Sequence, residues 1–564
     1  MNIKLKISLL LLMVMSISCE EYLKEEPPTF ISAQNYWKTA NDARTGVNAV
    51  YQKLNDLHNR WWIAIDAYTD DVVSRTTGGV FNPFGQHIVS PSDAIFEQYG
   101  VYSEWWIGIG RANNVLKYVP AIGMDAVEKN KVLGEARALR ALYYFNLVRA
   151  FGDMPMLTEG VVSERDFNKP RSSAEKIYDE IIIPDLKFAE VNCRDGLHDG
   201  HITKWTAKVI LADVYLTRAG WRRTSQGQLI QGDVSNWVLA KEKAKEILDS
   251  SPHSLNVVDK TNGSNVTPAC GVAWLDTAPF TSESMLELSY VQTLGLGNWM
   301  SRDSNPFVNA SQYWGPSANI NYTFIFDGVS VTGNLAVEST RNPSGLFFKG
   351  NPPGVGQEIP TPDLYDAFEA GDLRRDFSIM TRYKTPAGRN YLCQPTFRKF
   401  IDIAYYTGAE GTSFQYTTHN LILYRLADAL LIYAEAQNEA DGAPNAEAYS
   451  AINKIRIRAG LGSLTAGLSQ DAFRKAVWQE RRVELNGEFK RKFDLIRTKR
   501  LVTETTNINL NWTAAQGAKT NYVNCYTIFL NSRPAFPDHE WLWPIPQSEM
   551  DLNLKNGWIQ NKGY

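Results

Sequence analysis

The sequence lacks the features of an integral membrane protein, a nucleic-acid-binding protein and a disulfide-rich protein. After residue 18 it contains no apolar run that approaches the ~20 residues of a membrane-spanning helix. Its 58 basic and 61 acidic side chains give a formal net charge of -3, so charge provides no reason to expect a nucleic-acid partner. The 5 cysteines are widely spaced and form no CxxC pair, which argues against a zinc site and against a dense disulfide framework.

The motifs of common enzyme classes are also missing. The sequence contains no GxxxxGK[ST], GxSxG or HExxH motif, and its two short GxG stretches, Gly108–Gly110 and Gly295–Gly297, lack the third glycine of a dinucleotide-binding loop. A glycosidase would need two carboxylates ~5 to 10 Å apart across one cleft, and sequence spacing does not indicate such a pair. We therefore predict a protein that is not an enzyme, with no catalytic residues, no cofactor and no bound metal.

Two polar clusters have competing interpretations. His198, Asp199 and His201 could ligate a metal, but a polar turn between helices explains the same residues and is favoured. Asp70 and Asp71 could act as paired carboxylates or hold a cation. Neighbouring residues on a regular element point in different directions, so a capped helix end is favoured there.

Aromatic residues are abundant, with 16 Trp, 26 Tyr and 24 Phe. Most aromatic side chains in proteins lie in the core, and we expect one ring of each pair, Trp61–Trp62 and Trp105–Trp106, to pack inward. Flat apolar faces with polar edges are also what sugar rings stack against. Aromatic residues outside periodic segments are therefore the candidates for a binding surface.

The N-terminus has the pattern of a secretory signal peptide. Two lysines precede an apolar stretch at residues 7–15, and small residues follow up to Cys19. We expect residues 1–18 to be a signal peptide. Cys19 looks like the lipidated cysteine of a bacterial lipoprotein, and the acidic residues 19–30 are expected to form an extended tether. The mature protein would then be anchored to a membrane rather than embedded in it.

Helical periodicity dominates both ends of the chain. Three segments place Ala, Leu and Tyr at three- and four-residue steps, which lets a neighbouring helix approach closely, and each is followed by a second amphipathic segment. The three pairs are residues 131–152 with 173–191, 204–220 with 236–249, and 423–440 with 445–459, and a fourth pair is expected at 41–57 with 91–118. Paired helices with Ala at the crossing are typical of tetratricopeptide-like repeats, so we predict a mainly α fold.

The middle of the chain, about residues 255–420, has a different character. Gly, Pro and Asn become frequent, and short strand-like runs occur at residues 284–290 and 322–326. A second aromatic loop that contains glycine lies at residues 75–89. Loops on a rigid scaffold commonly carry binding residues, so we expect a ligand at these two segments.

The segment from Phe473 to Arg500, FRKAVWQERRVELNGEFKRKFDLIRTKR, combines regularly spaced charges with an apolar stripe. Its residues Glu480, Arg481, Arg482, Glu484, Leu485, Glu488, Arg491, Phe493, Asp494 and Leu495 match a pattern written ERRxELxxEGxRxFDL. This signature, together with residues 424–440 and 542–564, resembles the SusD/RagB family of outer-membrane nutrient-binding lipoproteins from Bacteroidetes. One departure is Gly487-Glu488-Phe489, where the family has aromatic, acid and glycine, so the local helix geometry is expected to differ.

The resemblance implies a fold, a function and partners. The expected fold is a SusD-like α-helical scaffold at residues 31–254 and 421–500, a loop-rich insertion at about 255–420 and a C-terminal segment at 501–564, together one domain. The implied function is capture of oligosaccharides at the cell surface and delivery to a SusC-like, TonB-dependent outer-membrane transporter. Peptide capture, as in the RagB branch, and a helical-repeat scaffold without a small ligand remain alternatives.

The candidate ligand residues come from the two non-periodic segments. An aromatic platform edged by amides and charged groups suits a polyhydroxylated ligand, because ring faces contact C–H groups and polar edges bind hydroxyls. We predict glycan contacts at Arg75, Phe81, Asn82, Phe84, Trp299, Tyr313, Trp314 and Tyr322.

Overall fold

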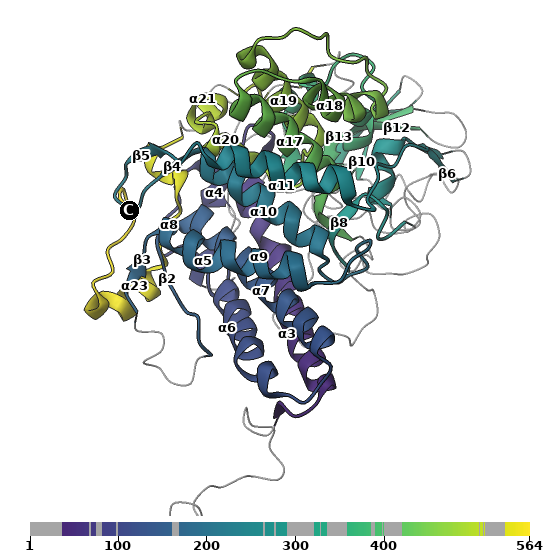
Figure 1. Cartoon of the computed structure of the whole chain (residues 1–564). Coiled ribbons are helices and arrows are strands. Elements are labelled where there is room, and N and C mark those ends of the chain that lie inside the picture. The colour runs from purple at the N-terminus through teal and green to yellow at the C-terminus, as the bar shows by residue number, and fades with distance from the viewer. Residues whose placement is uncertain are drawn as a thin grey trace, which may run out of the picture.

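The structure is a computed structural model of the whole chain (Figure 1). It describes residues 36–66, 69–74, 82–97, 100–160, 169–262, 265–275, 278–289, 321–326, 329–334, 358–384, 390–397, 399, 420–506, 508–510, 512–513 and 536–564.

Helices of the N-terminal half pack on one another in chain order. They are α3 (Ala40–Asp66), α5 (Ala94–Glu97), α6 (Ser103–Tyr118), α7 (Ala126–Phe151), α8 (Ala174–Ile177), α9 (Ile183–Asn192), α10 (Lys204–Ala219) and α11 (Asn236–Ser250). α3 contacts α6, α6 contacts α7, α7 contacts α9, α9 contacts α10 and α10 contacts α11. The predicted mainly α, tetratricopeptide-like architecture is therefore confirmed.

The C-terminal half continues the same stack. α11 packs on α17 (Leu426–Asp441), which contacts both α18 (Ala446–Arg458) and α19 (Gln470–Glu484). Figure 1 shows α10, α11 and α17 side by side in the middle of the molecule, with α3 and α6 at one end. The scaffold is thus a continuous series of neighbouring helices rather than two separate bundles.

Small residues permit the close approach of these helices. Ala207 and Ala212 of α10 and Ala240 and Ala244 of α11 are fully buried. At Gly134 of α7, an added Cβ would lie 2.8 Å from the sulfur of Cys193, so only glycine allows this contact.

Two predicted helices are interrupted. The segment 91–118 forms α5 and α6 with Gly100 between them, and Gly100 adopts φ of 71°, which ends a helix readily. The segment 173–191 forms α8 and α9 joined by a π turn at Tyr178–Ile182. Pro184 follows this turn at the start of α9, where its missing N–H cannot support the regular ladder.

The described strands form seven two-stranded antiparallel sheets. The pairs are β1 (Val72–Ser74) with β11 (Glu358–Pro360), β2 (Met154–Pro155) with β3 (Arg171–Ser172), β4 (Trp221–Arg223) with β5 (Leu229–Gln231), β6 (Lys260–Asn262) with β7 (Asn265–Thr267), β8 (Ser284–Leu288) with β14 (Leu421–Arg425), β9 (Asn321–Phe326) with β10 (Val329–Asn334), and β12 (Ile379–Lys384) with β13 (Asn390–Phe397). The strand-like runs predicted at 284–290 and 322–326 are β8 and β9.

The remaining described elements are short. They are α4 (Asn82–Gln86), α14 (Pro362–Asp366), α15 (Leu373–Ser378), α20 (Arg491–Arg497), α21 (Leu501–Thr506), α23 (Gln547–Asn553) and the 3-10 turns at Val119–Ala121, Ala269–Trp274, Asp538–Trp541 and Leu554–Asn556. No described helix is both long and apolar enough to cross a bilayer.

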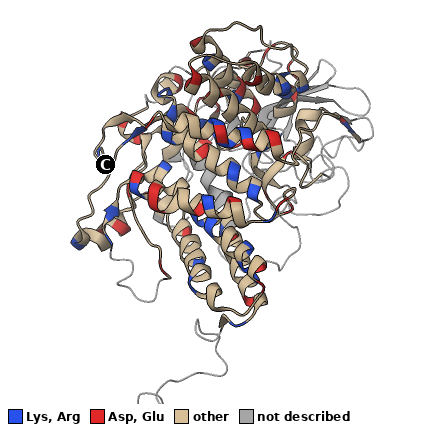
Figure 2. Ribbon diagram, viewed as in Figure 1, with Lys and Arg blue, Asp and Glu red and all other residues tan. Residues whose placement is uncertain are grey.

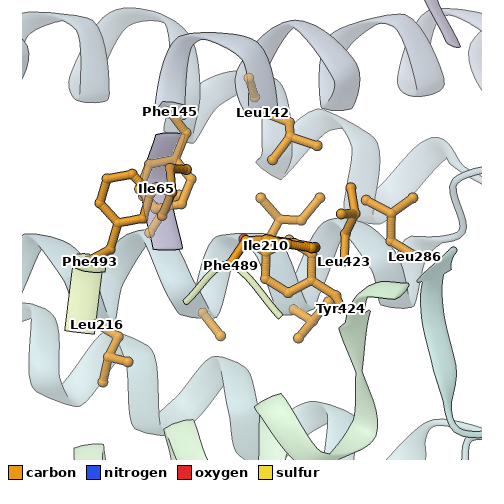
Figure 3. Packing of buried hydrophobic residues seen from close by; sticks show 14 of the residues in the cluster. Ile65, Leu142, Phe145, Ile210, Leu216, Leu286, Leu423, Tyr424, Phe489 and Phe493 are labelled. Atoms are coloured by element: carbon orange, nitrogen blue, oxygen red, sulfur yellow. The ribbon is translucent and has the colours of Figure 1, made fainter. Parts of the chain in front are cut away.

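One large apolar cluster joins the two halves of the chain. Phe489 and Phe493 lie in it among side chains of α7 and α10 (Figure 3). Trp105 is fully buried while Trp106 is partly buried, as predicted for this pair. The side chains of Trp61 and Trp62 lie outside the described residues.

The C-terminal segment closes on the N-terminal half. Trp543 is fully buried, its ring lies 5.6 Å from that of Phe151, and its backbone N–H donates to the carbonyl of Ala150 at 2.7 Å. The side-chain amide of Asn561 donates to the carbonyls of Phe151 at 2.8 Å and Trp543 at 2.7 Å. Residues more than 380 positions apart therefore form one layer of the core.

Candidate functional site

The signature segment is a helix, a tight turn and a second short helix. α19 ends at Glu484 and α20 begins at Arg491. Between them Gly487 adopts φ of 70° and Phe489 adopts φ of 62°, so the helix does not continue through the residues that depart from the family pattern. Glu488 lies in this turn, and Lys492 lies on α20.

The charges of the segment are buried rather than solvated. Glu484 is 3% exposed and receives hydrogen bonds from three guanidinium groups: Arg425 at 2.5 Å, Arg374 at 2.9 Å and Arg458. Burial raises the pKa of Glu484, but the three arginines outweigh burial and hold this pKa well below its usual range. Glu484 is therefore ionised at neutral pH in the interior of the protein.

The network extends from Glu484 to other elements. Arg425, the last residue of β14 and the residue directly before the scaffold helix α17, also binds Glu283 at 2.8 Å and Glu488 at 2.8 Å. Arg458 of α18 binds Glu283 at 2.6 Å, and Arg374 of α15 binds Asp372 at 2.7 Å and Glu480 at 2.5 Å. Buried charges are tolerated when each is paired and hydrogen-bonded, and that condition is met here.

A second branch ties α19 to α20. Arg481 binds Asp494 at 3.1 Å, and Asp494 also binds Arg497 at 2.7 Å, the neighbour three residues on. Arg497 donates to both oxygens of Glu435 on α17, at 2.5 and 2.8 Å. α19 and α20 are thus fixed to each other and to the scaffold.

Asp70 and Asp71 form a third branch. Asp70 accepts two hydrogen bonds from Arg491, at 2.8 and 2.7 Å, and Asp71 accepts one from Arg482 at 2.7 Å. Burial raises the pKa of Asp70, but Arg491 and Arg482 outweigh burial and lower it well below its usual range. The favoured prediction of a helix cap at Asp70 and Asp71 is wrong, because their side chains bind distant arginines and no helix N–H.

Within the segment 75–89, which was predicted as a loop, residues Asn82–Gln86 form the short helix α4. Phe84 lies on α4, is fully buried, and its ring is 5.8 Å from that of Phe96 and 5.1 Å from that of Trp543. The prediction of Phe84 as a stacking residue for a ligand is therefore wrong, since a core ring has no free face. Its neighbour Asn82 is the first residue of α4.

The other predicted ligand residues divide into two groups. Tyr322 lies on β9 opposite Gly333 of β10. The remaining predicted positions, Arg75, Phe81, Trp299, Tyr313, Trp314 and the lipidation residue Cys19, lie outside the described residues.

The cluster of His198, Asp199 and His201 is a polar turn. The Nδ1–H of His198 donates to the carbonyl of His201 at 2.9 Å, and its Nε2 accepts the backbone N–H of Glu287 at 2.9 Å. Nδ1 of His201 lies 3.1 Å from a carboxylate oxygen of Glu135. The two imidazoles therefore use their nitrogens on different partners, and among the residues that the structure describes no group of three His, Cys, Asp or Glu has metal-site geometry.

This arrangement predicts a pH dependence of stability. Burial lowers the pKa of His198 to about 4, outweighing its hydrogen bonds to the backbone carbonyls of Glu287 and His201, which raise it. Between this pKa and ~6.5 the unfolded chain binds the extra proton, so acidification destabilises the fold. Between pH 7 and 4.5 we expect wild type to lose about 2 kcal/mol more free energy of unfolding than His198→Asn, measured by urea unfolding. Equal losses would show that His198 does not titrate in this way.

One cavity lies between α7, α10, β4, α20 and the C-terminal segment. It has a volume of about 40 Å³ and is lined by Arg149, Arg218, Trp221, Phe493 and Trp541, among others. This cavity has room for ordered water.

Comparison with known proteins matches both ends of the chain. Residues 368–564 match the model described as the SusD family. Residues 21–216 match a related model described as starch-binding and associating with the outer membrane. SusD-like protein P25 of Formosa agariphila is 26% identical over 97% of this chain and 97% of its own length.

The chain belongs to the SusD/RagB family.

Solved structures of the SusD superfamily have the same fold. A laminarin-binding SusD-like protein is 24% identical with a TM-score of 0.67, covering 94% of this chain and 100% of its own. Surface glycan-binding protein A from Bacteroides fluxus is 23% identical with a TM-score of 0.68, covering 93% and 100%. A SusD superfamily protein from Parabacteroides distasonis gives 24% and 0.69, covering 95% and 100%.

The partners of the SusD/RagB signature were missed by sequence reasoning. Lys399, which follows β13, donates to Glu488 at 2.6 Å and to the carbonyls of Glu484 and Asn486 at 3.1 and 2.9 Å. Arg374 and Glu283 likewise come from the middle of the chain. The sequence shows that these residues are oppositely charged to those of the signature. It holds many acidic and basic residues, however, and charge alone does not specify which of them form pairs. The signature therefore anchors the insertion to the scaffold.

Proposed function

We propose that this SusD-family protein binds oligosaccharides at the cell surface. The observation that carries the proposal is similarity along nearly the whole chain to SusD-like proteins, among them a solved laminarin-binding protein. The helical scaffold supports it, because neighbouring helices pack along the chain and loops on such a scaffold commonly carry binding residues. Charge supports it as well, since acidic and basic residues are interspersed over the helices (Figure 2), as suits a neutral ligand.

The anchoring and delivery steps belong to the same proposal. Residues 1–18 act as signal peptide, Cys19 carries lipid, and residues 31–564 form the domain at the outer membrane, facing outward. The bound oligosaccharide passes to a SusC-like, TonB-dependent transporter. Modest affinity, roughly micromolar to millimolar, suits this transfer because the tether raises the effective concentration and tight binding would slow release. No catalytic step is required.

Calorimetry tests the ligand class. The domain from residue 20 is titrated with laminarin and other plant, host and microbial glycans, and with a peptide mixture. We expect heat from a glycan, and we expect Trp314→Ala to weaken binding at least about tenfold, because one stacked ring contributes on the order of 1.5 kcal/mol. Tyr36→Ala, which changes an aromatic residue before α3, serves as the control and should bind as wild type. Heat from peptides alone would reassign the protein to peptide capture, and silence from both classes would contradict a small-ligand function.

A further inference from the structure

The cavity between α7, α10, β4, α20 and the C-terminal segment is rich in arginine. Among the described residues its lining includes five arginines and a single carboxylate, namely Arg149, Arg218, Arg222, Arg223, Arg497 and Asp153. Its volume of about 40 Å³ is roughly three times the ~10–15 Å³ that one water molecule needs. The cavity therefore has room for a small polyatomic ion as well as for water.

Three of these arginines are neutralised by carboxylates that lie outside the cavity lining. The pairs, with N–O distances of 2.5 to 2.8 Å, are Arg218 with Glu175 and Asp179, Arg222 with Glu175, and Arg497 with Glu435 and Asp494. The protein thus balances the charge of these three by itself, and the other two arginines are left to consider.

Arg149 keeps one hydrogen-bond donor free. Its side chain is only 9% exposed, and its guanidinium carbon lies 4.0 Å from the ring centroids of Phe145 and of Phe493. Nη2 donates to Asn146, whereas Nη1 is 3.8 Å from Asp213, which is beyond hydrogen-bond distance. The Nε–H is buried and has no hydrogen-bond partner in the part of the chain that the structure describes. A buried charged donor without a partner is costly, so an acceptor in the cavity would stabilise it.

Arg223 adds positive charge to the same lining. It donates to the backbone carbonyl of Asp538, and no ion pair joins it to a carboxylate of the described residues. Lys562 lies beside it, because a Cβ added at Gly227 would be 2.8 Å from Cγ of Lys562 and 3.1 Å from Nη2 of Arg223. Two cations side by side repel each other, and an anion nearby relieves this repulsion.

The carbonyl ends of helices account for part of this arrangement. Arg149 and Arg218 stand in the last turns of α7 and α10, where cations are favoured. Arg223 lies on a strand, however, and neither helix end accepts the Nε–H of Arg149. We propose that the cavity is a binding site for one small oxyanion, such as phosphate, sulfate or a short carboxylate, held by Arg149 and Arg223. The inference does not depend on the oligosaccharide function proposed above.

The chemistry of the lining fits such an ion. The planar N–H groups of a guanidinium form short, charge-assisted hydrogen bonds with the oxygens of a carboxylate or phosphate. An ion in the cavity would lie beside Trp541 and Leu542 of the C-terminal segment as well as the end of α7. A ligand that binds only the folded state stabilises it, so the ion would strengthen the attachment of this segment.

Calorimetry tests the site and distinguishes its ligands. Sodium phosphate, sodium sulfate and sodium acetate are titrated separately into the protein, with sodium chloride at equal ionic strength as the blank. We expect saturable binding of at least one oxyanion by wild type and at least about tenfold weaker binding by Arg223→Gln, which loses one charged donor. Arg223 is partly exposed, so this variant is expected to fold.

Arg375→Gln is the matched control for calorimetry. Arg375 is also partly exposed but lies on α15, binds Asp376 at 3.1 Å and does not line the cavity, so the variant should bind as wild type does. The proposal is overturned if wild type binds none of the three oxyanions saturably, or if Arg223→Gln binds as tightly as wild type.

Thermal unfolding separates the site from the general effect of salt. Sulfate and phosphate stabilise folded proteins by exclusion from the surface, and this effect is shared by all variants. Binding in the cavity adds a rise in Tm that saturates with concentration, which we expect in wild type and Arg375→Gln but not in Arg223→Gln. Arg149→Lys keeps the charge and removes the Nε–H, so it should lose the saturable rise as well. An identical rise in wild type, Arg149→Lys and Arg223→Gln would show that the anions act only through the surface and would overturn the site.

Discussion

Replacing Glu484 by glutamine is expected to lower the free energy of unfolding by about 3–5 kcal/mol. Glu484 is the carboxylate on which Arg374, Arg425 and Arg458 converge. Removing its charge leaves three buried guanidinium groups with less negative charge than they were paired with, and such uncompensated burial is costly. Urea unfolding followed by circular dichroism measures the change.

Glu246 provides the matched control for this prediction. It also binds two cations, Lys208 and Lys243, but its side chain is 46% exposed. Solvent screens exposed pairs, so Glu246→Gln should cost less than about 1 kcal/mol. Similar losses in Glu484→Gln and Glu246→Gln would show that the buried network is not a principal source of stability.

Phe84→Ala is expected to destabilise the protein by about 3–5 kcal/mol, because it leaves a cavity in a packed aromatic cluster. The ring of Phe84 has no exposed surface and lies between Phe96 and Trp543. Ile88→Ala, at a side chain that is 57% exposed four residues later, is the control and should change stability by less than about 1 kcal/mol. Loss of glycan binding by Phe84→Ala with unchanged unfolding free energy would contradict the core assignment and return Phe84 to the ligand site.

The helical scaffold could be predicted from the sequence because the formation of a helix, and the choice of its buried face, depend on residues that are close together in the chain. Ala, Leu and Tyr at three- and four-residue steps in α10 predict both the helix and the face that meets its neighbours. The same rule predicted one buried ring in the pair Trp105–Trp106, since adjacent residues of a helix point in different directions.

The incorrect predictions concern residues whose burial or ion pairing depends on residues far away in the chain. Gly85 and Pro83 beside Phe84 indicate a loop, but the burial of Phe84 is decided by Trp543, over 450 residues away. The charges of the signature were correctly identified as unusual, and their regular spacing suggested neighbours along one helix. Most of their partners instead lie on other elements, as Asp71 does for Arg482 across 411 residues.

Trp543 and Asn561 contact the end of α7, so this part of the core is complete only when the C-terminal segment is present. Every chain is synthesised with its N-terminal residues first, so α7 and Phe84 are made long before residues 536–564, which cover them. During that interval the aromatic rings of the N-terminal half face water and attract other apolar surfaces. Chains that lack residues 536–564 are therefore expected to leave exposed the faces of Phe84 and Phe151 that Trp543 covers.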